Sequence, residues 1–388
     1  MIKNILILIL FSILLCIATG ATLSTSIEEH NSIIYSGNDN QLTGLKDEDS
    51  SGFSSDGPVI MYEDGKIISY SIRPFENAFK AYVEQINSSD SLTCYIDETD
   101  QHFSFTLKNS INTEKDVYDL PDKMLIVSDI EGNFKGFTMI LLGAGVINED
   151  LQWTFGGGHL VLAGDFFDRG INVTECLWLI YKLETEAERQ GGKVHFIIGN
   201  HEMMNLKGKF KYVRAKYLTN ADSLDLNYNK WYGDNSELGK WLRSKNGVEK
   251  IGDYLFLHAG ISKDFPVNTY SIIDINSCIR SSIDKTFAEG EASKDIFIGN
   301  ESPLWYRGIV KGTESQEEIE KTLAAFNSTK MILGHTIVDS IMYLYNNKVI
   351  AIDLDHQENT VKGVMYALWF ENENFYTIDN NGLKIELK

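Results

Sequence analysis

The chain has 388 residues, of which 43% are hydrophobic and 23% are charged. This composition is that of a globular protein and excludes a collagen, a polytopic membrane protein and a chain that is disordered throughout. Asp and Glu number 55 against 35 Lys and Arg, for a formal net charge of −20. An acidic surface repels phosphate backbones, so we expect no nucleic-acid partner.

The first twenty residues have the pattern of a secretory signal peptide. Lys3 supplies a positive charge, residues 5–17 are almost purely apolar, and Ala18-Thr19-Gly20 is a small-residue cleavage pattern. We therefore expect an exported protein, periplasmic or extracellular. Two alternatives stay open. The first is an uncleaved membrane anchor, although the apolar run is shorter than the roughly 20 residues of a membrane span. The second is a lipoprotein that uses Cys16, although Leu15 occupies a position that favours a small residue.

Two segments precede the main domain. Residues 21–57 are rich in Ser, Asp, Asn and Gly and predict a disordered tether. Residues 58–122 predict a small β-rich lead-in, because apolar and polar residues alternate on both sides of Glu63-Asp64-Gly65 and again over 92–107. Within it, residues 77–86 predict a short helix.

From residue 123 the pattern changes, since short apolar runs begin to alternate with amphipathic segments. The apolar runs predict strands over 124–128, 159–163, 194–198, 254–259 and 330–334. Helical spacing appears over 134–142 and 173–189, and residues 348–379 predict antiparallel strands at the end of the domain. Strands that alternate with helices indicate an α/β domain over 123–388.

A compact polar cluster follows each buried strand directly. Ligands of open α/β sheets bind at the carboxyl ends of strands, so these clusters should meet at one crevice. The side chains expected there are Asp129, Glu131, Asp165, Asp168, Asn200, His201, His258 and His335. Oxygen and imidazole ligands suit Mn²⁺, Fe, Zn²⁺ or Mg²⁺. Two such ions sharing one carboxylate would make hydroxide available and polarise a phosphate, and Arg169 could bind two phosphate oxygens.

These clusters, in order, are D-x-E-G-N, G-D-x-x-D-R-G, G-N-H-E, H-A-G and G-H-T. The series resembles the calcineurin-like metallophosphoesterase superfamily, and Arg169 makes it similar to the phosphoprotein-phosphatase branch. Residues 203–213 (MMNLKGKFKYV) and 303–308 (PLWYRG) resemble the Shewanella-like protein phosphatases. The resemblance covers about residues 123–380. It implies a sandwich of two mixed β-sheets flanked by helices, and a metal-dependent phosphatase.

The resemblance also implies a role for each site residue. Asp129 and Glu131 would bind the first metal ion, and Asp165 would bridge the two ions. The second ion would be completed by Asn200, His258 and His335. His201 would be the general acid for the leaving oxygen, oriented by Asp168, while Arg169 and Arg307 would hold the phosphate oxygens. Tyr306 and Asn205 are candidates for the pocket wall.

Glu131 departs from the family's pattern, which has His at this position. A glutamate adds negative charge and has a longer, more flexible reach than an imidazole. The site becomes richer in oxygen, which favours Mn²⁺ or Mg²⁺ over softer ions. An extended Asp129-Ile130-Glu131 segment would place both carboxylates on one face. We expect two divalent ions, with Mn²⁺ favoured over Fe, Zn²⁺ and Mg²⁺.

The sequence thus predicts an exported two-metal phosphomonoesterase. Its expected substrates are phosphorylated proteins or peptides, with small phosphorylated molecules as a further possibility, and it would meet a membrane only through an N-terminal anchor. One alternative is a nucleotidase or phosphodiesterase of the same fold. The other is a catalytically weak binding protein, which the departure at Glu131 would permit.

Overall fold

The computed structural model describes Asp49, residues 51–97, Thr99 and residues 101–388. The predicted signal peptide and most of the predicted tether lie outside these residues. Within the part of the chain that is described, no helix combines the length and the apolar character needed to cross a membrane.

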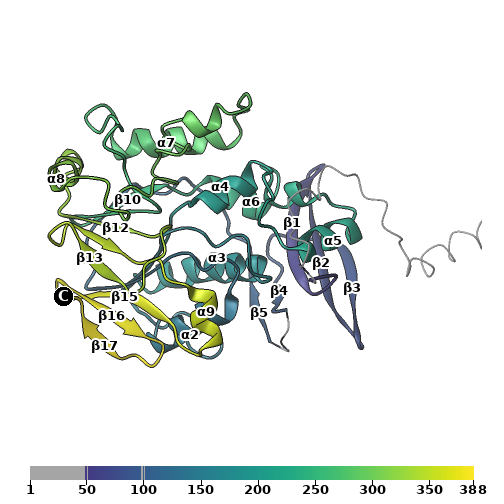
Figure 1. Ribbon diagram of the computed structural model, residues 1–388. Helices are drawn as coiled ribbons and strands as arrows, with labels where there is room; N and C mark the ends of the chain where they lie inside the picture. The colour runs from purple at the N-terminus through teal and green to yellow at the C-terminus, as the bar shows by residue number, and fades with distance from the viewer. Residues whose placement is uncertain (1–48, 50, 98, 100) are drawn as a thin grey trace, which may run out of the picture. The chain divides into compact units, whose positions relative to one another are not determined.

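Two six-stranded mixed sheets form the main domain (Figure 1). The first has the strand order β17 (Lys384–Glu386), β16 (Asn374–Asp379), β15 (Tyr366–Glu371), β7 (Lys123–Val127), β8 (His159–Leu162), β9 (Lys193–Phe196). The second has the order β13 (Met342–Leu344), β14 (Val349–Ala351), β12 (Lys330–Leu333), β11 (Tyr254–Leu257), β10 (Val248–Ile251), β6 (Val117–Tyr118). Strands β7, β8 and β9 are parallel to one another, as are β11, β12 and β14.

The alternation of side chains along the strands explains why the sheets stack. In β7, Met124 and Ile126 belong to an apolar cluster that also contains Phe256 of β11, Ile332 of β12 and Ile350 of β14. The intervening residues of β7 belong to the other core cluster, which includes the buried faces of the helices. Each central strand is therefore buried on both faces. The predicted sandwich of two mixed sheets flanked by helices is confirmed.

Eight α-helices are described. They are α2 (Phe134–Gly143), α3 (Val173–Arg189), α4 (Asn200–Leu206), α5 (Ala215–Ser223), α6 (Glu237–Arg243), α7 (Ile272–Ile283), α8 (Gln316–Ala325) and α9 (His356–Val361). Two short 3₁₀ helices span Tyr228–Tyr232 and Ala292–Lys294. The helices predicted over 134–142 and 173–189 are confirmed, since each shows a continuous apolar face that the sheet covers.

The lead-in is β-rich, as predicted, but one of its elements is not a helix. Strands β1 (Asp56–Glu63), β2 (Lys66–Phe75) and β3 (Ala78–Ile86) form an antiparallel sheet, and β4 (Leu92–Tyr95) pairs with β5 (His102–Phe105). The helix predicted over 77–86 is wrong, because β3 pairs with β2 along its whole length. Backbone pairing with a neighbouring strand outweighs a weak helical pattern.

The C-terminal segment is antiparallel only in part. Strands β15 and β16 pair antiparallel in the first sheet, as the sequence predicts. Strand β14 instead enters the second sheet, where it lies parallel to β12 and antiparallel to β13. The parallel pairing brings the carboxyl end of β14 to the same edge as the carboxyl end of β12, with consequences for the site.

The end of the predicted tether contacts the main domain. The Asp49 carboxylate accepts hydrogen bonds from Arg214 Nε (2.9 Å), Arg214 Nη2 (2.9 Å) and the Ala215 amide (2.9 Å). Strand β1 begins at Asp56, and Trp178 Nε1 of α3 donates to the Pro58 carbonyl (2.8 Å). Asp49 and residues 51–57 thus contact the domain, because Arg214 and the helix start at Ala215 offer donors to a short acidic segment.

Candidate metal centre and catalytic site

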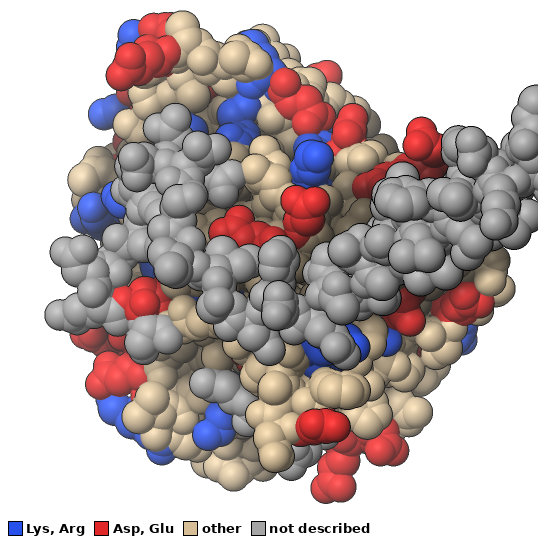
Figure 2. Space-filling view, turned by 90° about the vertical axis from the view of Figure 1, so that its right-hand side faces the viewer, with Lys and Arg blue, Asp and Glu red and all other residues tan. Residues whose placement is uncertain are grey.

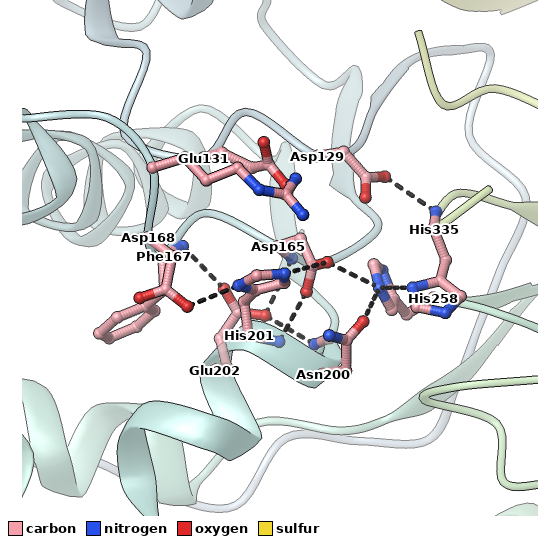
Figure 3. A network of polar contacts seen from close by, with 12 residues as sticks. Asp129, Glu131, Asp165, Phe167, Asp168, Asn200, His201, Glu202, His258 and His335 are labelled. Atoms are coloured by element: carbon pink, nitrogen blue, oxygen red, sulfur yellow. Dashed lines mark hydrogen bonds and ion pairs between the residues drawn. The ribbon is translucent and has the colours of Figure 1, made fainter. Parts of the chain in front are cut away.

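Residues that follow β7, β8, β9, β12 and β14 line one cavity of about 240 Å³, and the residue that follows β11 contacts these lining residues from behind. The end of β7 delivers Asp129 and Glu131, and the end of β8 delivers Asp165, Asp168 and Arg169. The end of β9 leads into α4 with Asn200 and His201, while β11 and β12 of the other sheet are followed by His258 and His335. Figure 3 shows the carboxylate, amide and imidazole side chains of this set converging. The structure therefore brings together the residues that the sequence places after separate strands.

The backbone at this cavity is strained. Non-glycine residues rarely adopt positive φ, yet here φ is 54° at Asp129, 50° at Glu131, 59° at Asp165 and 65° at His335. The extended Asp129-Ile130-Glu131 segment expected from the sequence is therefore wrong, although both carboxylates still line the cavity. Strain of this kind persists only where the surroundings hold it, and it clusters at functional sites.

Hydrogen bonds to neighbouring strand ends hold this backbone. The Asp129 amide donates to the Gly164 carbonyl and the Glu131 amide to the Asp165 carbonyl, both at 2.9 Å. Close packing leaves no room for a side chain at Gly199, where a Cβ would lie 2.3 Å from Asp165 Oδ1. The glycine at this position lets the start of α4 approach the Asp165 carboxylate.

Four side chains from four strand ends meet at His258 Nε2. This nitrogen lies 3.0 Å from Asn200 Oδ1, 3.1 Å from His335 Nδ1 and 3.1 Å from Asp165 Oδ2. The other ring nitrogens point to carbonyl oxygens: His258 Nδ1 to Ala163 (2.8 Å) and His335 Nε2 to Trp305 (3.0 Å). Those contacts favour protons on the two outer nitrogens, so the inner nitrogens of both rings are aimed at the same point and would face a cation that displaced the proton from His258 Nε2. The donor set fits a divalent cation.

Burial and mutual charge shift the pKa values of this group in opposite directions. Burial alone would lower the pKa of His258, but the Asp165 carboxylate outweighs it and raises that pKa to about 10. Burial and the adjacent His258 lower the pKa of His335 to about 2. Burial and the Asp165 charge raise the pKa of Asp129 to about 6, against the opposing effect of His258. The three groups lie in one buried electrostatic network that a bound cation would reorganise.

A second group of candidate ligands, Glu131, Asp165 and His201, lies beside the first. In this group, the Glu131 carboxylate already forms an ion pair with Arg169. The Arg169 guanidinium also lies 5.5 Å from the centre of the Tyr212 ring. Arg169, which also lines the cavity, thus contacts both a predicted metal ligand and an aromatic ring.

His201 has the environment of a proton donor. Its Nδ1 lies 2.5 Å from Asp168 Oδ2, and its Nε2 faces the cavity, 3.9 Å from Asp165 Oδ2. Burial would lower the pKa of His201, but Asp165 and Asp168 outweigh it and raise that pKa. Asn205 Nδ2 donates to Asp168 Oδ1 (2.9 Å) and to the His201 carbonyl (3.0 Å). Asn205 therefore supports the pair from behind rather than lining the cavity.

The two predicted residues of the PLWYRG segment differ in position. Arg307 lines the cavity and donates from Nη1 to the His335 carbonyl. Tyr306 is absent from the cavity lining, and its hydroxyl donates to Glu314. Arg307 is accordingly placed to reach an anion in the cavity, whereas Tyr306 anchors the loop that carries it.

Glu202, which was not among the predicted site residues, supports the turns that carry the site. The buried Glu202 accepts hydrogen bonds from the backbone amides of Gly199 (2.7 Å), Asp165 (2.9 Å) and Phe166 (2.7 Å). Burial and the Asp165 charge raise its pKa to about 7. Glu202 thereby ties the turn after β8 to the start of α4. Its presence in the G-N-H-E motif was the available signal.

A second omission is the segment after β14. Asp353, Asp355 and His356 all line the cavity. They follow a short apolar strand directly, as the predicted site residues do, so the same pattern could have identified them. The sequence predicted an antiparallel arrangement for these C-terminal strands. In that arrangement the end of β14 has no reason to face the site, so these residues were not predicted.

Two sheets that direct Asp, Asn and His side chains into one crevice define a metal-dependent hydrolase of phosphoric esters. The family model described as calcineurin-like phosphoesterase matches residues 123–339, more than half of the chain. The chain belongs to this family, and it is a metal-dependent phosphatase whose fold and family imply divalent metal ions.

Similar proteins carry phosphatase names. Shewanella-like protein phosphatase 2 of Arabidopsis thaliana is 26% identical over 298 residues, which cover 65% of this chain and 75% of that one. Shewanella-like protein phosphatase 1 of Plasmodium berghei is 27% identical over 272 residues, covering 68% and 73%. The crystal structure of a cold-active protein-tyrosine phosphatase from a psychrophilic Shewanella species is 31% identical, with a TM-score of 0.76, covering 86% of this chain and 99% of that one.

Proposed function

We propose that this chain is an exported two-metal phosphomonoesterase that acts on phosphorylated proteins or peptides. The observation that carries the proposal is the convergence of Asp165, Asn200, His258 and His335 on one point, with the His201–Asp168 pair beside it. Two divalent ions, Mn²⁺ first among them, would supply an activated water and polarise the phosphate.

The chain's own residues have separable tasks in this proposal. Asp129, Glu131 and Asp165 would hold the first ion, and Asp165, Asn200, His258 and His335 the second. Arg169 and Arg307 would bind the non-bridging phosphate oxygens by charge-assisted hydrogen bonds. His201 Nε2 would donate a proton to the leaving oxygen while Asp168 stabilises the imidazolium and fixes its orientation.

Two arginines at the cavity favour a phosphate monoester over a diester. A monoester dianion carries one more negative charge than a diester, and Arg169 and Arg307 can match it. The phosphatase names of the similar proteins support protein or peptide substrates. The net charge of −20 argues against nucleic acid, and on the face shown in Figure 2 the described acidic side chains are interspersed with basic ones rather than giving way to a basic stripe.

The test uses the full mature protein, treated with a chelator and then reloaded with Mn²⁺. We expect hydrolysis of phosphotyrosyl and phosphoseryl peptides and of p-nitrophenyl phosphate, with activity lost on chelation and regained with Mn²⁺. Faster hydrolysis of bis-p-nitrophenyl phosphate or of nucleotides would favour the alternative phosphodiesterase or nucleotidase. Stable metal binding without turnover of any ester would favour a binding protein.

Export rests on the charged, apolar and small-residue pattern of residues 1–20. Sequencing the N-terminus of the native protein tests it, and we expect the chain to begin at Ala21. A native N-terminus at Met1 with the protein in the membrane fraction would indicate an anchor, and lipid attached at Cys16 would indicate a lipoprotein.

A further inference from the structure

The wall of the cavity formed after β14 has no role in the mechanism above. Asp353 lies two residues after the last residue of β14, as His335 does after β12 and Asp129 after β7. Since β14 and β12 are parallel neighbours, their carboxyl ends lie at the same edge of the sheet. Asp353 therefore occupies the same position, relative to its strand, as the predicted metal ligands that follow β7 and β12.

The Asp353 carboxylate is buried without a partner. Asp353 is 3% exposed and lines the cavity. Among the described residues, no side chain or amide forms a hydrogen bond or an ion pair with its carboxylate. Burial and the charge of Asp129 raise its pKa well above the usual range, although His258 and Arg307 oppose this from a distance. A buried carboxylate beside another carboxylate is costly unless a cation compensates it.

Asp355, two residues further on, has a structural role in the same turn. Asp355 is exposed and lines the same cavity, but its side chain caps α9 by accepting a hydrogen bond from the Glu358 amide (2.9 Å). The capping role accounts for Asp355 and leaves Asp353 unexplained. The two aspartates form a matched pair for experiment.

Another polar group on this wall lacks a well-placed partner. His356 is 3% exposed and lines the cavity, and neither ring nitrogen makes a hydrogen bond of good geometry among the described residues, although a contact with the Ser128 backbone opposes the lowering of its pKa by burial. Buried polar groups in folded proteins are nearly always satisfied, so unsatisfied groups on a cavity wall point to a bound polar species.

In the first metal site predicted from the sequence, one of the three ligands is already paired with another side chain. Asp129 and Asp165 line the cavity, but the third assigned ligand, Glu131, is engaged by Arg169. Hard divalent cations such as Mn²⁺ and Mg²⁺ favour several oxygen ligands. A further carboxylate from the segment after β14 would supply one and would offset the weaker hold of a shared Glu131.

We propose that Asp353 provides a carboxylate oxygen to the first metal ion, beside Asp129 and Asp165. The inference rests on the proposed two-metal function and adds a ligand from the segment after β14. It also predicts a site that is richer in oxygen than the assigned ligand set and therefore prefers Mn²⁺ or Mg²⁺ to Zn²⁺.

The experiment measures metal binding rather than turnover. The chelated full mature protein and its Asp353→Asn and Asp355→Asn variants are titrated with Mn²⁺ by calorimetry, and bound metal is counted after dialysis. We expect two ions in the wild type and in Asp355→Asn. Asp353→Asn should bind one ion as the wild type does and the other at least tenfold more weakly, and Asp353→Glu should recover part of the loss.

The Tm of the chelated protein, measured with and without Mn²⁺, provides a second test that distinguishes a metal ligand from a purely structural residue. Removing an unpartnered buried charge should leave the Tm of metal-free Asp353→Asn unchanged or higher, while the rise in Tm on adding Mn²⁺ becomes smaller. Wild-type binding of two ions by Asp353→Asn overturns the inference and leaves the proposed function standing. A wild type that binds no Mn²⁺ overturns both.

Discussion

His201 Nδ1 lies 2.5 Å from Asp168 Oδ2, and this contact turns His201 Nε2 toward the cavity. The two residues come from different strand ends, β9 and β8, and Asn205 holds Asp168 from the far side. A histidine oriented by a buried carboxylate, with its other ring nitrogen directed into the cavity, is suited to proton transfer. The first prediction depends on this geometry.

His201→Asn should leave the metal content near two ions per chain and lower kcat by about 10²–10⁴-fold for substrates with poor leaving groups. The loss should be smaller for p-nitrophenyl phosphate, whose leaving oxygen needs little protonation. Steady-state kinetics on an alkyl and an aryl phosphate, with metal analysis, check this, and His102→Asn on β5 is the control. Equal losses on both substrates, or a loss of metal, would remove His201 from this role.

Glu131 forms an ion pair with Arg169 and is a predicted ligand of the first metal ion. Glu131→Ala should weaken binding of the first ion and lower activity together, because it removes a carboxylate ligand. Glu131→His should restore both, shift metal preference toward Zn²⁺ or Fe, and release Arg169 to bind phosphate. Metal titrations and inhibition by inorganic phosphate test these effects. If Glu131→Ala keeps both ions and the full rate, Glu131 is not a ligand.

The contact between Asp49 and Arg214 sets where a stable shortened chain can begin. Arg214 Nη1 also donates to the Arg169 carbonyl (3.1 Å), so this contact reaches the turn that carries a predicted phosphate ligand. A chain starting at Gly44 should keep the Tm and KM of the mature protein. One starting at Pro58 loses Asp49 and the first residues of β1, and its Tm should fall by several degrees (about 1–2 kcal/mol). Equal Tm and KM for the two chains would show that residues 44–57 are dispensable.

Away from the cavity, a pair of histidines, His195 buried and His159 half-buried, should make stability depend on pH. His159 Nδ1 lies 3.0 Å from His195 Nε2, and His195 Nδ1 lies 2.7 Å from Glu249 Oε2. Burial and the neighbouring His195 lower the pKa of His159 to about 3. In the unfolded chain this histidine titrates at about 6.5. The unfolded state therefore binds a proton that the folded state does not, and the free energy of unfolding falls as pH drops from about 6.5 toward 3.

His159→Gln should flatten this dependence by about 1 kcal/mol between pH 7 and pH 5, a value reduced because the ring is partly exposed to solvent. Urea unfolding of the chelated protein at both pH values measures it, with His102→Gln as the exposed control. An unchanged slope for His159→Gln would assign the pH dependence to other groups.

Local sequence patterns were enough to predict most of the site. A buried strand is a short apolar run, and the polar residues that follow it are adjacent in sequence, so Asp129, Asp165, Asn200, His258 and His335 could each be assigned to a strand end. The rule that such ends face a common crevice then brings them together. Both steps use only neighbouring residues and one general property of α/β sheets.

Contacts between distant segments required the tertiary structure. The pairing of β3 with β2 replaced a predicted helix, because the neighbouring strand supplies the hydrogen bonds of the backbone. The ion pair of Glu131 with Arg169 joins two turns from different strands. The parallel placement of β14 beside β12 brings Asp353 to the cavity. A sequence pattern reports what each residue's neighbours along the chain are, whereas strand order and side-chain partners follow from how the whole core packs.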